Sequence, residues 1–178
     1  RGVRQMKNII LTGYMASGKT VVGKKISSIL RMPFDDTDEM IVRTSGRSIN
    51  DIFAEFGEEY FRKLEHAAAV ECSKKGGFVI ACGGGMVLNP DNISALRKNG
   101  KVFNLNPTEE VIRQRFAAAA ETRPLMKNDT IDGVLARFWQ RLPYYENCDY
   151  KIDITPGRSI EDIAMEITDI YKKQENQF

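Results

Sequence analysis

The sequence predicts an α/β fold with three layers, in which helices cover both faces of a five-stranded parallel sheet. Five short apolar runs, rich in β-branched residues, have the length and composition of buried strands. Segments whose apolar residues recur at helical spacing separate these runs. Because strands that alternate with helices run parallel and are buried on both faces, this order predicts a layered α/β domain. A chain of 178 residues suits one domain, which we expect over 1–178 with 1–7 as an extension.

The first part of the chain is predicted to contain two strands and two helices. Residues 8–12 (NIILT) form a buried strand. Residues 21–30 have the apolar spacing of a helix, which ends before Pro33 because proline cannot continue it. A second short strand follows at 34–37, and we expect a helix at 38–44.

Two further helices are predicted next, with a break between them. Ser48 precedes Asp51 by three positions, which marks a helix start. Gly57 is expected to end that helix, because glycine readily adopts the conformation that closes a helix. Residues 58–75 continue as a charged helix with one apolar stripe.

Strands and helices alternate in the remainder of the chain. The further strands are predicted at 78–82, 101–105 and 150–154. Helices are predicted from Asn89-Pro90 onward, at 108–115, at 131–145 and at 159–172. Residues 117–130 contain an alanine run and a polar stretch without periodicity, so we expect an irregular segment there. Long irregular insertions in compact domains are usually functional, which favours a mobile flap.

The composition excludes several classes of function. A net charge of +2 is too small for a nucleic-acid-binding stripe or a membrane-binding patch. The three cysteines have no metal-binding spacing, so we expect reduced thiols in a cytoplasmic protein. The single histidine, His66, lies in a helical run and is expected to be a packing residue, which disfavours catalysis by histidine.

A phosphate-binding loop follows the first predicted strand. Residues 13–20, GYMASGKT, match the pattern G-x-x-x-x-G-K-[ST] at every fixed position. Backbone N–H groups of such a loop, and the helix N-terminus after it, point at phosphate oxygens. We expect Lys19 to reach the β- and γ-phosphates and the Thr20 hydroxyl to bind Mg²⁺. The expected nucleotide-binding residues of this segment are Gly13, Ala16, Ser17, Gly18, Lys19, Thr20 and Val21.

Carboxylates follow the second predicted strand, in the sequence DDTDE at 35–39. Ligands of parallel α/β sheets bind beyond the carboxyl ends of the strands, where this cluster lies. Since residues two apart in a strand share a face, Asp36 and Asp38 are candidates for one site, one near a metal ion and one near an acceptor hydroxyl. The structural alternative makes Asp38 a helix N-cap and leaves Asp35 and Asp36 in solvent. The phosphate loop upstream favours the functional interpretation.

With these motifs and others in a fixed order, the sequence resembles shikimate kinases, which are P-loop kinases of the nucleoside-monophosphate-kinase type. The order and spacing of the motifs make the resemblance specific, and it extends from about residue 8 to 170. The motifs are the loop at 13–20, Asp36-Thr37-Asp38, Gly46-Arg47-Ser48-Ile49, Gly57-Glu58, Phe61-Arg62 with Glu65, Gly83-Gly84-Gly85, Arg123-Pro124-Leu125, and Arg141 with Pro143 and Tyr145. The resemblance implies a P-loop NTPase fold with a mobile lid at 117–130.

The resemblance also implies an activity and its residues. ATP would phosphorylate the 3-hydroxyl of shikimate, giving shikimate 3-phosphate and ADP in aromatic amino-acid biosynthesis. Asp36 would hold Mg²⁺ through water, and Asp38 would bind the shikimate hydroxyls and accept a proton. Arg62 and Arg141 would clamp the carboxylate. The pocket around that carboxylate would be lined by Gly83, Gly84 and Gly85.

Two more arginines take roles from the resemblance. Arg123 would lie on the lid and reach the transferring phosphates, and Arg115 would pack on the adenine ring. Arg115 lies eight residues before Arg123, where the family pattern has seven. The extra residue leaves Arg113 as an alternative for the adenine contact.

Other functions with a phosphate loop remain as alternatives, because the loop alone does not separate them. A related small-molecule kinase, such as gluconate kinase, is the main one. A GTP-dependent switch would need an N-K-x-D motif, which the sequence lacks. A nucleotide-binding module without catalysis is disfavoured by Lys19, Asp38 and Arg123. We expect a monomer that binds Mg²⁺, ATP and shikimate, and neither nucleic acid nor membrane.

Overall fold

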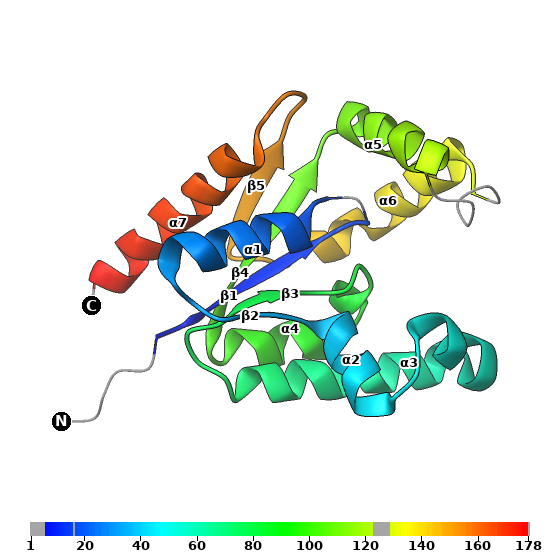
Figure 1. The fold of residues 1–178 in the computed structure, drawn as a ribbon, viewed down its shortest axis with the longest axis horizontal. Coiled ribbons are helices and arrows are strands. Elements are labelled where there is room, and N and C mark those ends of the chain that lie inside the picture. The colour runs from blue at the N-terminus through cyan, green and yellow to red at the C-terminus, as the bar shows by residue number, and fades with distance from the viewer. Residues whose placement is uncertain (1–5, 16, 123–128, 178) are drawn as a thin grey trace.

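A computed structural model describes residues 6–15, 17–122 and 129–177 (Figure 1). Within these residues five strands form one sheet in the order β2-β3-β1-β4-β5, and each neighbouring pair is parallel. The strands are β1 Asn8–Gly13, β2 Phe34–Asp36, β3 Val79–Ala81, β4 Gly100–Pro107 and β5 Tyr150–Ile154. The predicted five-stranded parallel sheet is therefore confirmed.

Helices cover both faces of this sheet, as predicted (Figure 1). They are α1 Lys19–Leu30, α2 Thr37–Ser45, α3 Ile49–Ser73, α4 Pro90–Arg97, α5 Glu109–Thr122, α6 Ile131–Tyr145 and α7 Ile160–Asn176, with a short 3₁₀ helix η1 Met86–Leu88. One core cluster joins Ile10 to residues of α3, α4 and α6, and a second joins Ile9 and Leu11 to residues of α1 and α7. Successive residues of β1 thus face opposite layers, as a strand requires.

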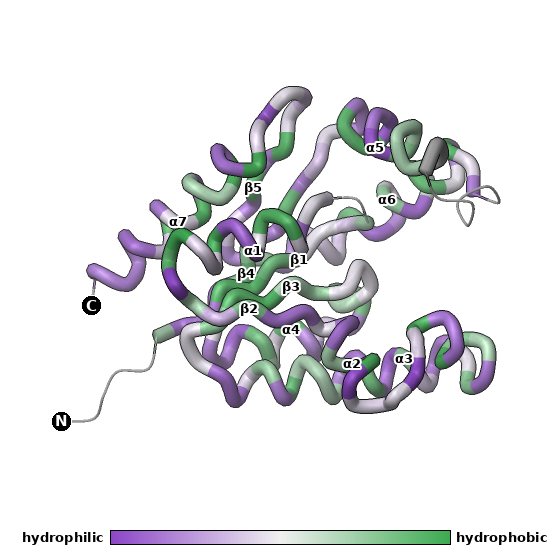
Figure 2. Tube along the Cα trace, in the orientation of Figure 1, coloured by the Kyte–Doolittle hydropathy of each residue, from purple (hydrophilic) through white to green (hydrophobic). Residues whose placement is uncertain are grey.

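The central strand β1 is buried along its whole length, which explains its continuous apolar run. In Figure 2, hydrophobic residues follow the central strands and polar residues follow the outer faces of the helices. The buried polar residue Asn8 is fully paired: its amide donates to the carbonyl oxygens of Cys72 and Lys75 and accepts from the N–H of Phe78. Burial of this amide therefore leaves no uncompensated polar atom.

The strand order brings the predicted motifs together. β1 lies between β3 and β4, and β3 lies between β1 and β2. Because all strands are parallel, the segments that follow β1, β2 and β3 leave the sheet at the same edge. Those segments carry the phosphate loop, the carboxylates and the glycine triplet.

Most predicted elements lie within a residue or two of their observed bounds, but two helices extend further: α7 continues past the predicted end at 172 to Asn176, and α5 is longer than predicted. Residues 117–122 were predicted to be irregular, and this is wrong: α5 continues through Thr122. Alanine has the highest helix propensity, so the run at 117–120 extends the helix although it adds no apolar periodicity. The rest of the predicted flap comprises 123–128, which lie outside the described residues, and 129–130, which precede α6.

The predicted break at Gly57 is confirmed, because α3 consists of two helical parts that meet there. Gly57 has φ 82° and ψ 174°, which is not a helical conformation, and it joins two helical parts at a kink. Of the predicted extension at 1–7, only Met6 and Lys7 are described. Their carbonyl oxygens accept hydrogen bonds from the N–H of Gly77 and the hydroxyl of Tyr171, so both pack against the domain. None of the described helices combines the length and apolarity needed to span a membrane.

Candidate active site

The phosphate loop curls tightly around the side chain of Lys19. Its ammonium group donates to the carbonyl oxygens of Gly13 at 2.6 Å and Tyr14 at 3.1 Å, and lies 3.4 Å from Ser17 Oγ. Gly18, at the start of α1, has φ 87°, a left-handed conformation that favours glycine. The loop therefore holds one positive charge at its centre, at the N-terminus of a helix.

Lys19 is poised to accept an anionic partner. Although the residue is only half-buried, its ammonium lies inside the loop, and burial lowers the pKa of Lys19 to about 8. The charges of Asp36 and Asp38 oppose this shift. Desolvation without a contacting counter-ion disfavours the charged form, so a phosphate group placed here would gain a strong electrostatic partner.

Thr20 and Asp36 lie together at the start of α1 and the end of β2. The Thr20 hydroxyl donates to Asp36 Oδ2 at 3.4 Å. A hydroxyl and a carboxylate that leave room for phosphate oxygens and water are the donors that Mg²⁺ prefers. Among the described residues no group of three or more His, Cys, Asp and Glu side chains is arranged to hold a metal. A metal ion here would therefore take most of its ligands from the nucleotide and from water.

Asp36, and not Asp38, is the N-cap of α2. Its Oδ1 accepts from the N–H groups of Asp38 at 2.8 Å and Glu39 at 3.3 Å. The structural alternative for Asp38 is therefore wrong, and so is the one for Asp35, which is buried and bonded to Arg43 and Lys75. The premise that Asp36 and Asp38 share a strand face is also wrong, because β2 ends at Asp36.

Asp38 nevertheless faces the same site from the first turn of α2. It is half-buried, and burial together with the negative charge of Asp36 raises its pKa, against the opposing charges of Lys19 and Arg62. A Cβ atom added to Gly83 would lie 2.5 Å from Asp38 Oδ1. The carboxylate thus packs against the first glycine of the triplet. A raised pKa makes Asp38 a stronger base than an ordinary aspartate.

Two arginines from distant parts of the chain act on one buried carboxylate, Glu65, one by direct contact and one through its charge. Arg62 on α3 donates to Glu65 Oε1 at 2.9 Å and to Glu58 Oε1 at 3.1 Å. Burial raises the pKa of Glu65, and the charges of Arg62 and of Arg141 on α6 oppose this. Both predicted clamp arginines thus lie on the side of the site where Glu65 is buried, Arg62 in contact with it and Arg141 within range of its charge.

Glu65 is a site residue whose role the sequence did not predict. It is 1% exposed, and with Phe61, Ala68 and Cys72 it occupies the buried side of α3. A charged residue within an apolar stripe, three positions after an arginine, was the available signal. Its buried charge is tolerated because Arg62 pairs with it.

The glycine triplet after β3 makes room for these side chains. A Cβ atom on Gly85 would overlap the guanidinium of Arg62, and one on Gly83 would crowd Asp38. The carbonyl oxygen of Gly84 accepts a hydrogen bond of 2.7 Å from the hydroxyl of Tyr145. The triplet thus packs against Asp38 at its first glycine and against Arg62 at its third.

Arg115 on α5 lies over the phosphate loop, whereas Arg113 does not. A Cβ atom on Gly18 would be 3.6 Å from Arg115 Nη1, and burial lowers the pKa of Arg115. Arg113 is exposed and donates to Glu109 Oε1 at 2.9 Å. Val21 is exposed in the first turn of α1. Ala16 and Arg123, both predicted to contact the nucleotide, lie outside the described residues.

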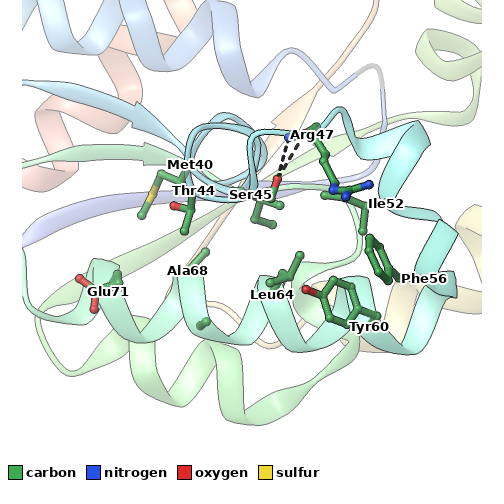
Figure 3. A pocket seen from close by; sticks show the side chains of 12 residues that line it. Met40, Thr44, Ser45, Arg47, Ile52, Phe56, Tyr60, Leu64, Ala68 and Glu71 are labelled. Carbon is green, nitrogen blue, oxygen red and sulfur yellow. Dashed lines mark hydrogen bonds between the residues drawn. The ribbon is translucent and has the colours of Figure 1, made fainter. Parts of the chain in front are cut away.

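A cavity of about 440 Å³ lies apart from this cluster, between α2 and α3 (Figure 3). Its walls include Ile41, Phe56, Tyr60 and Leu64, and none of the predicted site residues lines it. The cavity has mostly apolar walls, whereas phosphoryl transfer needs positioned charges. The charged cluster at the strand ends is therefore the candidate active site.

Comparisons with known proteins agree with this geometry. The family model for shikimate kinase matches residues 15–172. The chain is 43% identical over 168 residues to the shikimate kinase of Caldanaerobacter subterraneus subsp. tengcongensis, which covers 94% of this chain and 98% of the relative. The structure of the present chain resembles that of a shikimate kinase from Acinetobacter baumannii in complex with shikimate, with a TM-score of 0.83 and 30% identity. The match covers 96% of this chain and 95% of that one.

A gluconokinase from Sinorhizobium meliloti is a more distant likeness. It has a TM-score of 0.60 and 14% identity, with coverage of 98% of this chain and 97% of its own. This likeness shows a common fold and nothing about the acceptor. The family model and the curated relative both cover nearly the whole chain, and both favour shikimate kinase over the gluconate kinase alternative. The chain belongs to the shikimate kinase family.

Proposed function

We propose that this chain transfers the γ-phosphoryl group of ATP to the 3-hydroxyl of shikimate, giving shikimate 3-phosphate and ADP for aromatic amino-acid biosynthesis. One observation carries the proposal. A loop suited to phosphates, containing Lys19, adjoins a cluster suited to a hydroxylated acid, formed by Asp38, Arg62 and Arg141. A kinase with this acceptor needs both sites within reach of each other.

On the donor side, the loop backbone and Lys19 bind the β- and γ-phosphates. Arg115, which lies over Gly18, contacts the nucleotide. Mg²⁺, held by Thr20 and through water by Asp36, would neutralise charge on the phosphates. The 3.4 Å contact between these two side chains supports that assignment. Catalysis on this side is mainly positioning and charge stabilisation.

On the acceptor side, Asp38 accepts the proton of the 3-hydroxyl as that oxygen attacks the γ-phosphorus. The O–H bond breaks, the new O–P bond forms, and the bond between the γ-phosphorus and ADP breaks. The raised pKa of Asp38 suits this role. Arg62 and Arg141 bind the carboxylate, since a guanidinium pairs bidentately with it. Backbone groups of 83–85 line the ring of the acceptor.

Further assignments follow from the family resemblance. Arg123 stabilises the transferring phosphoryl group from a lid over 117–130. The position of Arg115, on the helix that leads into this segment, supports a lid beside the phosphate loop. We also propose a single-domain cytoplasmic monomer. The three cysteines, all free, accord with that location.

A panel of acceptors tests the proposed function. ADP release is measured with Mg-ATP and shikimate, quinate, gluconate or a nucleoside monophosphate. We expect fast release with shikimate and only background with the others. A faster reaction with another acceptor, or release that does not depend on any acceptor, would contradict the proposal.

A further inference from the structure

Tyr145, at the end of α6, has no role in the mechanism above, yet it contacts both halves of the site. We propose that Tyr145 is a positioning residue, which holds the glycine triplet and Arg141 in register with the phosphate loop and so sets the affinity for the acceptor. The inference rests on the proposed function. Three interactions of the buried Tyr145 side chain support it.

The first contact is with the glycine triplet. The Tyr145 side chain is buried, and its hydroxyl donates to the Gly84 carbonyl oxygen at 2.7 Å. Three successive glycines lack the side chains that normally restrict a backbone. A short hydrogen bond from a rigid ring therefore restrains the middle peptide group of a segment that is intrinsically mobile. That segment packs against Asp38 and Arg62.

The second contact is with the phosphate loop. The ring of Tyr145 lies at 6.3 Å and 72° from the ring of Tyr14, an edge-to-face arrangement. Tyr14 is 1% exposed, and its own hydroxyl donates to the carbonyl oxygen of Val134 on α6 at 3.0 Å. Tyr14 also packs against Phe138. Helix α6 is thus joined to the loop by Tyr14 and to the triplet by Tyr145.

The third contact is electrostatic and involves the clamp. Tyr145 and Arg141 lie one turn apart on α6, where side chains share a face. Burial raises the pKa of Tyr145 to about 12, although the charge of Arg141 opposes this. The phenol of Tyr145 therefore stays neutral and remains a hydrogen-bond donor near neutral pH. A neutral phenol does not pair with the charge of Arg141, which stays available for the acceptor carboxylate.

The test is the Tyr145→Phe variant, which keeps the ring and removes the hydroxyl. A matched control is Tyr171→Phe. Both tyrosines are 3% exposed, both hydroxyls donate to a backbone carbonyl oxygen at 2.7 Å, and burial raises both pKa values to about 12. Tyr171 lies on α7, and its hydroxyl bonds to Lys7 and not to the glycine triplet. The two variants lose equivalent hydrogen bonds in different places.

We expect both variants to lose a similar amount of thermal stability. Only Tyr145→Phe should raise the KM for shikimate, by roughly 3- to 10-fold, which is the range expected from one hydrogen bond. Its KM for ATP should stay within about 2-fold of the wild type. An unchanged KM for shikimate would overturn the proposal, and so would equal rises in both KM values. Turnover of shikimate by the wild type, measured in the same assay, tests the proposed function separately.

Discussion

The Thr20 hydroxyl lies 3.4 Å from one carboxylate oxygen of Asp36, whose other oxygen caps the helix that carries Asp38. One side chain thus joins the candidate metal site to the N-terminus of α2. Helix α2 begins directly at the end of β2, so there is no loop to absorb a shift between them. The position of the Asp38 carboxylate is therefore fixed relative to the nucleotide side of the site.

Substitution of Asp36 separates its two functions. Asn caps helices about as well as Asp, so Asp36→Asn should fold with near-normal stability. It should nevertheless need a much higher Mg²⁺ concentration for half-maximal activity, because the carboxylate charge is lost. Asp36→Ala should lose the cap as well, which costs about 0.5–2 kcal/mol of unfolding free energy. Mg²⁺ titrations and thermal unfolding measure the two effects.

Ser159→Ala is the control for the cap of α2. Ser159 caps α7 by accepting from the N–H of Asp162 at 3.1 Å, on a helix that carries none of the candidate site residues. This variant should lose similar stability and keep the Mg²⁺ dependence of the wild type. The metal assignment fails if Asp36→Asn shows the same Mg²⁺ dependence as the unmodified protein.

Asp38→Asn should remove the general base. We expect kcat to fall by about 10²–10⁴-fold with little change in nucleotide affinity. Because only the deprotonated carboxylate accepts a proton, wild-type kcat/KM for shikimate should fall as the pH drops through the raised pKa of Asp38. The variant should lack this acidic limb. Wild-type turnover in the Asn variant would rule out the role, and a collapse of nucleotide affinity would assign Asp38 to the metal.

Titration of Lys19 should limit nucleotide binding at high pH. Burial lowers its pKa to about 8, so above that pH the free protein loses the positive charge that binds phosphate. Affinity for ATP should therefore decrease as the pH rises through about 8. Lys19→Met should bind ATP weakly at all pH values, without this decrease. Equilibrium binding measurements from pH 6.5 to 9.5 check both, and a wild-type affinity that is constant across this range would contradict the assignment.

Arg62 and Arg141 should act as one clamp on the acceptor carboxylate. Each charged hydrogen bond is worth roughly 1.5–3 kcal/mol, so Ala at either position should raise the KM for shikimate by about 10- to 100-fold. The two losses should not be additive, because both side chains bind one group. Arg62→Ala should also destabilise the protein, since it removes the ion-pair partner of the buried Glu65.

Arg158→Ala is the control for these two substitutions. Arg158 pairs with Asp162 and Glu166 on α7, and its loss should leave both KM values unchanged. The methyl ester of shikimate provides an independent check, because it lacks the carboxylate charge. The clamp does not exist if the ester is phosphorylated as efficiently as the free acid.

The elements were predictable from the sequence where one physical signal dominated. The buried strand β1 is a continuous apolar run, and the loop after it matches a motif at every fixed position. The helix around 117–122 was missed because alanine supplies propensity without periodicity. The alternative that made Asp38 the cap of α2 is wrong, because β2 ends at Asp36 and Asp36 itself caps the helix. The premise that Asp36 and Asp38 share a strand face fails for the same reason, since element ends are set by a few hydrogen bonds.

The residue types of the site were predictable from the sequence, but the contacts between those residues were less so. The resemblance named Arg62 and Arg141, but nothing in the spacing of α3 and α6 shows that Arg62 pairs with the buried Glu65 and that the charge of Arg141 also acts on it. Likewise, the bond from Tyr145 to Gly84 joins residues 61 positions apart. Such contacts depend on how helices pack across the sheet, which local patterns do not specify.

A competition between two acceptors tests the central claim most directly. Equal concentrations of shikimate and gluconate are incubated with limiting Mg-ATP, and the phosphate esters are identified by ³¹P NMR. The account predicts one ester, on the 3-oxygen of shikimate, formed in equal amount to ADP, and no ester in the Asp38→Asn variant on the same time scale. Phosphorylated gluconate as the main product, or ADP formed with inorganic phosphate in place of an ester, would contradict it.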